Sequence, residues 1–132
     1  MLKIKFPKKT NYSLFFKKEG MDFLNFFTKK KKLFDQRVNS DPHIPELRDL
    51  YNLYQLILLN NRTTILEYGC GWSTLVMHFA LMKNNRIKSG QTFTRCGNPF
   101  ELISVDNSKK FIKISKDRIK KFSKNYQKVK YY

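Results

Sequence analysis

TTILEYGCGWST, residues 63–74, is the stretch that decides the fold of this chain. Its first half is short, apolar and rich in β-branched residues, as in a strand, and its second half passes through Gly-x-Gly into a Ser-Thr pair, as at the start of a helix. Gly69 and Gly71 lack a Cβ, so the backbone can turn sharply there, and we expect its N–H groups to stay uncovered. Ser73 or Thr74 is expected to cap the helix. The stretch predicts a strand–turn–helix unit that a ligand can approach closely.

Helices and strands are expected to alternate on both sides of this unit. The periodicity predicts helices over 46–60, 73–84 and 109–122, strands over 63–68 and 102–105, an irregular segment over 86–99, and the start of a third strand at 127–132. Such alternation predicts an α/β fold, a Rossmann-like parallel sheet with flanking helices. We expect this sheet to be incomplete after about the third strand and to leave an unpaired edge, which predicts marginal stability or self-association.

With 132 residues, the chain is expected to form at most one domain. Residues 1–40 differ from the rest because aromatic clusters alternate with lysine runs, and we interpret them as a basic, aromatic N-terminal extension with a short helix over 22–34. Residues 41–132 are then the partial Rossmann-like domain. The extension could bind nucleic acid by stacking bases on its aromatic rings. We prefer the alternative that it packs these rings on the domain, because no RNP-type motif is present.

The net charge of +17 admits two interpretations. A polyanion such as RNA, DNA or an anionic membrane surface is one partner that such a charge favours. The other interpretation is compositional, because Lys, Asn, Phe, Ile and Tyr are all plentiful, as an AT-rich genome would favour. We prefer this second interpretation. No apolar run is long enough to span a bilayer and no signal peptide is evident, so a cytoplasmic location is expected.

Cysteine and histidine are too few and too scattered for a metal site. Cys70 and Cys96 are interpreted as reduced thiols, and neither they nor His43 and His78 show metal-ligand spacing. His78 falls within a predicted helix and is interpreted as a partly buried or surface histidine. Trp72 is expected to pack over the turn rather than to stack on a substrate.

Two acidic residues flank the turn where open α/β sheets bind ligands. Glu67 lies at the carboxyl end of the first strand and Asp106 follows the second, and an acid at the latter place accepts hydrogen bonds from ribose hydroxyls in Rossmann-like sheets. A dinucleotide is disfavoured because Thr74 stands where a third glycine is required and because Glu67 would repel a pyrophosphate. A ligand with an amino-acid head and a ribose fits better, since Glu67 could serve its ammonium and the turn amides its carboxylate.

The run 67–74, followed by Ile103-Ser104-Val105-Asp106, resembles the class I S-adenosylmethionine-dependent methyltransferases over about residues 45–132. The resemblance implies S-adenosylmethionine as the methyl donor, with the loop of Gly69 and Gly71 on its methionine part. It also implies that Glu67 orients that part and that Asp106 binds the ribose. We therefore predict the cofactor-binding residues Glu67, Gly69, Gly71, Ser73, Thr74 and Asp106.

The chain departs from the family pattern in three places. The link over 86–99 is long, Asn107 stands where an apolar residue often packs on adenine, and the later strands with the substrate-side residues are absent. No catalytic residue and no methyl acceptor can therefore be predicted. Two alternatives stay open, a non-catalytic basic nucleic-acid-binding module and, third, a nucleotide-sugar or dinucleotide binder.

Overall fold

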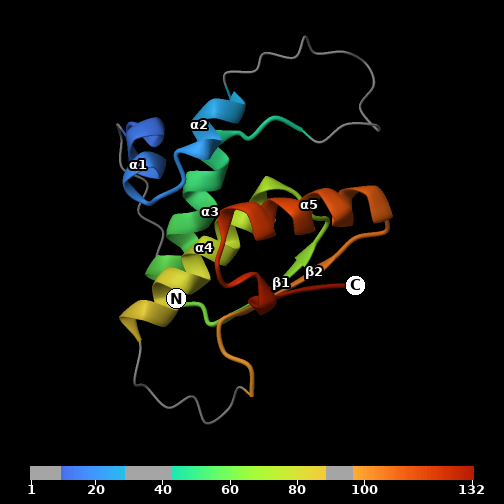
Figure 1. The fold of residues 1–132 in the computed structure, drawn as a ribbon. Coiled ribbons are helices and arrows are strands. Elements are labelled where there is room, and N and C mark those ends of the chain that lie inside the picture. The colour runs from blue at the N-terminus through green and yellow to red at the C-terminus, as the bar shows by residue number, and fades with distance from the viewer. Residues whose placement is uncertain (1–9, 29–42, 89–96) are drawn as a thin grey trace.

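The computed structural model describes residues 10–28, 43–88 and 97–132 (Figure 1). Its helices and strands are, in chain order, α1 (Tyr12–Lys18), α2 (Phe23–Thr28), α3 (Leu47–Leu59), β1 (Thr64–Tyr68), α4 (Trp72–Ile87), β2 (Glu101–Val105), α5 (Lys109–Phe122), a 3-10 turn (Tyr126–Lys128) and β3 (Val129–Tyr131).

The strands form one parallel sheet in the order β1-β2-β3. Leu66 of β1 lies opposite Ile103 of β2, and Leu102 of β2 lies opposite Val129 of β3. Parallel strands need crossover connections, and α4 and α5 supply them. The prediction of an α/β fold with a parallel sheet and flanking helices is confirmed. In the described parts of the chain β1 and β3 are both edge strands.

Within the described residues, the two faces of β1 differ in how far they are covered. Ile65 and Glu67 of β1 point to the side on which α4 packs, whereas Leu66 and Tyr68 point away and are 55% and 80% exposed. Ile103 and Val105 of β2 lie beside Leu66 and Tyr68 on this second face, and both are partly buried. Self-association, which the unpaired edge of the sheet suggested, stays a prediction, and Leu66 and Tyr68 add an exposed apolar patch on β1 to that edge.

The buried core joins the N-terminal helices to the rest of the described chain. Phe16, Met21 and Leu24 of the α1–α2 region are fully buried in the same cluster as the apolar side chains of α3 and α4. Phe23 stacks on Phe122 of α5 with the ring centroids 4.1 Å apart. Figure 1 shows α1 and α2 beside α3. Most of the described aromatic residues of the extension pack on the core, as expected, whereas Phe26 is 60% exposed.

Helix boundaries differ from the prediction by more than one residue at two places. The helix expected over 22–34 begins at Phe23 and ends at Thr28, and residues 29–34 lie outside the described part; α1 was not predicted. α4 continues past Asn84 to Ile87. Asn84 does not end this helix because its side-chain amide donates to the carbonyls of Ile57 and Arg62, at 3.3 and 2.9 Å, instead of competing for its own backbone.

None of the helices in the described ranges combines the length and the apolar character that a bilayer crossing requires.

The prediction for His78 needs a correction. This side chain is fully buried rather than partly buried or at the surface, because it faces the core from the middle of α4.

Candidate functional site

The glycine turn connects β1 to α4. Gly69 has φ +82°, a conformation that side chains with a Cβ rarely adopt, and Gly71 is the N-cap of α4 with an extended φ of −170°. The turn amides are not uncovered, which corrects the expectation from sequence. The N–H of Gly69 donates to the Val105 carbonyl at 2.7 Å, and that of Cys70 donates to the Asp106 carboxylate at 2.8 Å. The N–H of Gly71 donates to the Thr74 hydroxyl at 2.9 Å.

Thr74 therefore provides the capping hydroxyl, from within the first turn of α4 rather than from the position before it. Its Oγ1 accepts from Gly71 and donates to Glu67 at 2.7 Å, so one hydroxyl joins the turn to β1. Ser73 makes no such cap; its hydroxyl donates to the other oxygen of Glu67 at 2.5 Å. Sequence reasoning placed both residues correctly at the helix start but did not foresee that they bind Glu67.

Glu67 is a buried acceptor at the centre of the site, with 9% of its surface exposed. A third hydroxyl, that of Ser104 on β2, donates to it at 3.0 Å. Burial raises the pKa of Glu67, the three hydroxyl donors partly offset this rise, and the nearby charge of Asp106 adds to it. Because both carboxylate oxygens bind protein hydroxyls, Glu67 holds β1, β2 and α4 together.

Asp106 lies at the carboxyl end of β2, on the same edge of the sheet as the turn. Its two oxygens accept from the N–H groups of Cys70, at 2.8 Å, and Ser108, at 2.7 Å. These two bonds lower the pKa of Asp106, so the carboxylate is ionised at neutral pH. The structure thus brings Glu67, the turn and Asp106 together at one edge, as the order of the strands predicted.

Open space lies in front of both glycines. A Cβ built on Gly69 or on Gly71 would meet no heavy atom within 4 Å. The positive φ of Gly69 is reason enough for a glycine, but the extended φ of Gly71 suits any residue. Neither backbone strain nor packing within the described chain therefore requires a glycine at Gly71.

Cys70 does not supply a reactive thiol, and Trp72 does not supply a ring on which a substrate could stack. Burial and a hydrogen bond to Asp106 raise the pKa of the Cys70 thiol to about 12, so the thiol stays protonated. Trp72 is buried, and its indole N–H donates to the His43 carbonyl at 3.1 Å. The guanidinium of Arg118 lies 3.8 Å from the Trp72 ring centroid. Trp72 is a packing residue, as predicted. Arg118 was missed, because nothing in the sequence of α5 distinguishes it from the surrounding cations.

Among residues 10–28, 43–88 and 97–132, no three His, Cys, Asp or Glu side chains are grouped as a metal ion would require. Cys96 lies outside these ranges.

Comparisons with protein-family models, with curated proteins and with solved structures found no match to this chain. Function must therefore be inferred from the geometry of this edge of the sheet.

Proposed function

We propose that this chain is the cofactor-binding part of an S-adenosylmethionine-dependent methyltransferase with a Rossmann-like sheet. The observation that carries the proposal is Gly71, a glycine that neither φ nor packing requires, facing open space beside the ionised Asp106. A missing Cβ at such a place lets a ligand approach the backbone closely. A neighbouring carboxylate suits the cis-diol of a ribose. The residues present therefore fit the cofactor.

Asp106 is the residue that can bind the ribose. Each of its carboxylate oxygens accepts one backbone N–H, which leaves further lone pairs as acceptors for hydroxyl groups. Since the same two bonds fix the carboxylate against the turn, Asp106 is already oriented before a ligand arrives. It also sets the position of the glycine loop, so the ribose site and the loop are built as one unit.

Glu67 acts as a positioning residue in this proposal. Its carboxylate is occupied by Ser73, Thr74 and Ser104, so it orients the first turn of α4 rather than binding the ammonium of the ligand directly. The bound cofactor supplies a methyl group on a sulfonium, which an acceptor can take up. The chain's own contribution is to hold the donor in one orientation, which is how such sites accelerate a transfer between two reactants.

Titration calorimetry with S-adenosylmethionine tests the proposal. We expect Gly71→Val to abolish binding, because its side chain fills the approach to the backbone. Gly97→Val is the matched control, since Gly97 is equally open but lies before β2, at the opposite edge of the sheet. We expect Asp106→Asn to weaken binding about tenfold or more, the effect of losing charged hydrogen bonds, and Asp117→Asn on the exposed side of α5 to leave it unchanged.

Two results would count against the proposal. One is an absence of binding to the unmodified chain, and the other is an equal effect of Gly71→Val and Gly97→Val. Circular dichroism of each variant separates loss of the site from loss of the fold.

The alternative of nucleic-acid binding also has an observation in its favour. Six lysines on α5 are exposed: Lys109, Lys110, Lys113, Lys116, Lys120 and Lys121. Such a cationic surface neutralises phosphates, and the affinity then falls steeply as salt rises. Binding of RNA or DNA that weakens with salt and ignores both Gly71→Val and Asp106→Asn would favour this function instead.

A further inference from the structure

A groove of about 340 Å³ lies between α5 and β3. Lys116, Ile119 and Lys120 line it from α5, and Val129 and Tyr131 line it from β3. Because β3 stands last in the order of the sheet, one of its edges has no neighbouring strand within the described residues. None of the residues predicted to bind the cofactor lines the groove, so an inference about it does not depend on that proposal.

The free edge of β3 presents backbone groups to this groove. Both backbone groups of Tyr132 point toward β2, since its N–H donates to the Ser104 carbonyl at 3.0 Å and its C=O accepts from the Asp106 N–H at 3.1 Å. In a parallel pair, the backbone groups of successive residues point to opposite edges of the strand. The N–H and C=O of Tyr131 and the C=O of Val129 therefore point away from β2. Such a row of groups is a template for a further strand.

The side chains of the groove combine apolar surface with positive charge. Ile119 and Val129 are buried, whereas Lys116 and Lys120 are exposed. Nζ of Lys116 lies 5.3 Å from the ring centroid of Tyr131, so this lysine reaches from α5 to β3. Within the described part of the chain, no carboxylate forms an ion pair with either lysine. The groove therefore offers apolar contacts beside two cations that a ligand can neutralise.

The net positive charge of the described chain is concentrated in the same region. Residues 107–132 contain ten Lys and Arg residues, most of them exposed, and one acidic residue, Asp117. In the remaining described ranges, 10–28, 43–88 and 97–106, seven Lys and Arg residues are balanced by seven Asp and Glu residues. A compositional bias alone would not separate the chain in this way. The charge therefore favours an acidic partner at α5 and β3.

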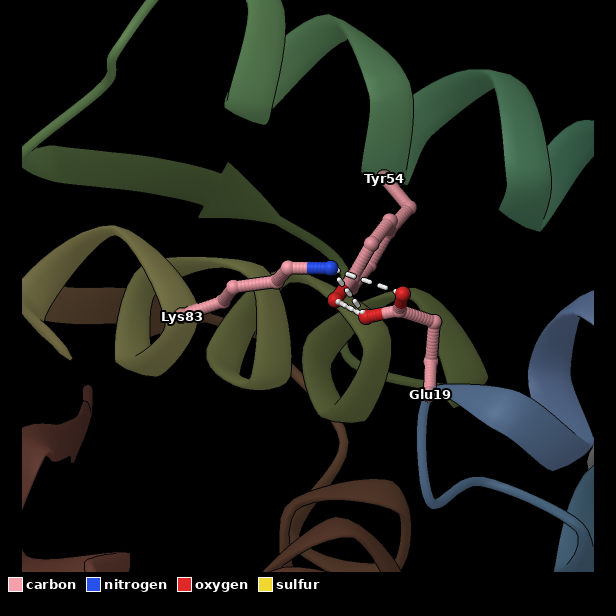
Figure 2. A network of polar contacts seen from close by, with 3 residues as sticks. All are labelled: Glu19, Tyr54 and Lys83. Carbon is pink, nitrogen blue, oxygen red and sulfur yellow. Dashed lines mark hydrogen bonds and ion pairs between the residues drawn. The ribbon is translucent and has the colours of Figure 1, made fainter. Parts of the chain in front are cut away.

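Lys83 shows how this chain neutralises a cation within its own fold. Figure 2 shows the Glu19 carboxylate between the Lys83 ammonium and the Tyr54 hydroxyl, which come from α4 and α3. Lys83 Nζ lies 2.7 and 2.6 Å from the two carboxylate oxygens, and the Tyr54 hydroxyl donates to one of them at 2.6 Å. Burial raises the pKa of Glu19, but the bonds from Lys83 and Tyr54 outweigh it and the net pKa is lowered. An acidic side chain of a partner would do for Lys116 and Lys120 what Glu19 does for Lys83.

We propose that the groove binds an extended, acidic peptide segment of a partner protein, which adds to the sheet as a strand beside β3. Its backbone bonds to the outward groups of Val129 and Tyr131, and its acidic side chains face Lys116 and Lys120. In this mode of recognition, main-chain hydrogen bonds supply affinity and alternate side chains supply specificity. A second copy of this chain is disfavoured at β3, because two lysine-rich helices would face each other.

A nucleic acid fits this groove less well than a peptide strand does. The lysines attract phosphates, but the carbonyls of Val129 and Tyr131 also point out of this edge, and a phosphate has only acceptor oxygens to offer them. A peptide strand carries N–H donors as well as acceptors, so it satisfies both kinds of group.

Fluorescence anisotropy with a labelled octapeptide of alternating valine and glutamate tests the proposal. We expect the unmodified chain to bind this peptide. Methylation of every backbone nitrogen keeps the charge and the side chains of the peptide but removes its N–H donors, so it should weaken binding about tenfold or more. A peptide of alternating valine and lysine should not bind.

Two double variants of the protein locate the site. Lys116→Gln/Lys120→Gln should weaken binding about threefold to tenfold, since each exposed cation contributes modestly. The matched control Lys17→Gln/Lys18→Gln removes the same charge at the end of α1 and should leave binding unchanged. All four lysines are exposed, so none of these changes removes a buried contact.

Equal weakening by the two double variants, or equal binding of the methylated peptide, would show unspecific charge attraction and overturn the proposal. An absence of binding to the unmodified chain would overturn it as well. Tighter binding of oligothymidylate than of the peptide, lost in Lys116→Gln/Lys120→Gln, would assign the groove to nucleic acid instead. Gly71→Val should not affect the peptide, so failure here and failure of the cofactor proposal are distinguishable.

Discussion

Acid should destabilise this protein through one buried histidine. His78 is fully buried, and its Nε2 lies 2.7 Å from the Ser123 hydroxyl. Its Nδ1 is buried without a hydrogen-bond partner within the described residues. A protonated imidazole would place a charge in this apolar environment, so burial lowers the pKa of His78 from 6.5 to about 4. The perturbation is therefore a fall in pH from 7 to 4.

The magnitude follows from proton linkage. Below pH 6.5 the unfolded chain binds a proton at His78, whereas the folded chain does so only near pH 4, so the free energy of unfolding falls over this window. A difference of about 2.5 pKa units corresponds to about 3 kcal/mol, of which about 2 kcal/mol is lost by pH 5. A domain has only about 5–15 kcal/mol in total, so the effect is large.

Urea denaturation at a series of pH values, followed by circular dichroism, measures this loss. His78→Gln removes the titrating group but keeps a side chain that can bond to Ser123, so its unfolding free energy should fall about 3 kcal/mol less between pH 7 and 4. His43→Gln is the control, because the chain has two histidines and His43 is exposed. Carboxylates such as Glu19 titrate alike in all three proteins and cancel in the comparison. Parallel curves for the unmodified chain and His78→Gln would refute the reasoning.

Two further predictions concern the turn and the second face of the sheet. Thr74→Val keeps the side-chain volume but leaves the Gly71 N–H and one oxygen of Glu67 without their shared partner, so we expect a loss of about 2–4 kcal/mol in urea denaturation. Thr28→Val removes a single neutral bond, to the Asn25 carbonyl, and should cost about 1 kcal/mol; equal losses would contradict the role of Thr74. The protein should also associate with rising concentration in sedimentation, and Tyr68→Thr should reduce this, because Tyr68 is 80% exposed on the second face; a monomer at all concentrations would contradict it.

The alternation of strands and helices was predictable because it depends on local pattern. The helix over Lys109–Phe122 was predicted with its observed bounds, since Ser108 caps it and an apolar stripe with period 3.6 follows. The end of α4 was not predicted correctly, because an asparagine pair such as Asn84-Asn85 is typical of a helix end. The Asn84 amide bonds to carbonyls 22 and 27 residues away in the chain, and no local pattern contains such partners.

The sequence by itself determined that a strand, a glycine turn and a helix follow one another over about residues 63–84, and that Glu67 and Asp106 lie at the carboxyl ends of neighbouring parallel strands. Local propensity and the shared direction of the strands suffice for that. Only the tertiary structure decided how these groups are used. Glu67 is buried under three hydroxyls, and the turn amides bind inside the protein instead of facing a ligand. Hydrogen bonds between distant residues form wherever burial removes water, and burial is a property of the packed chain.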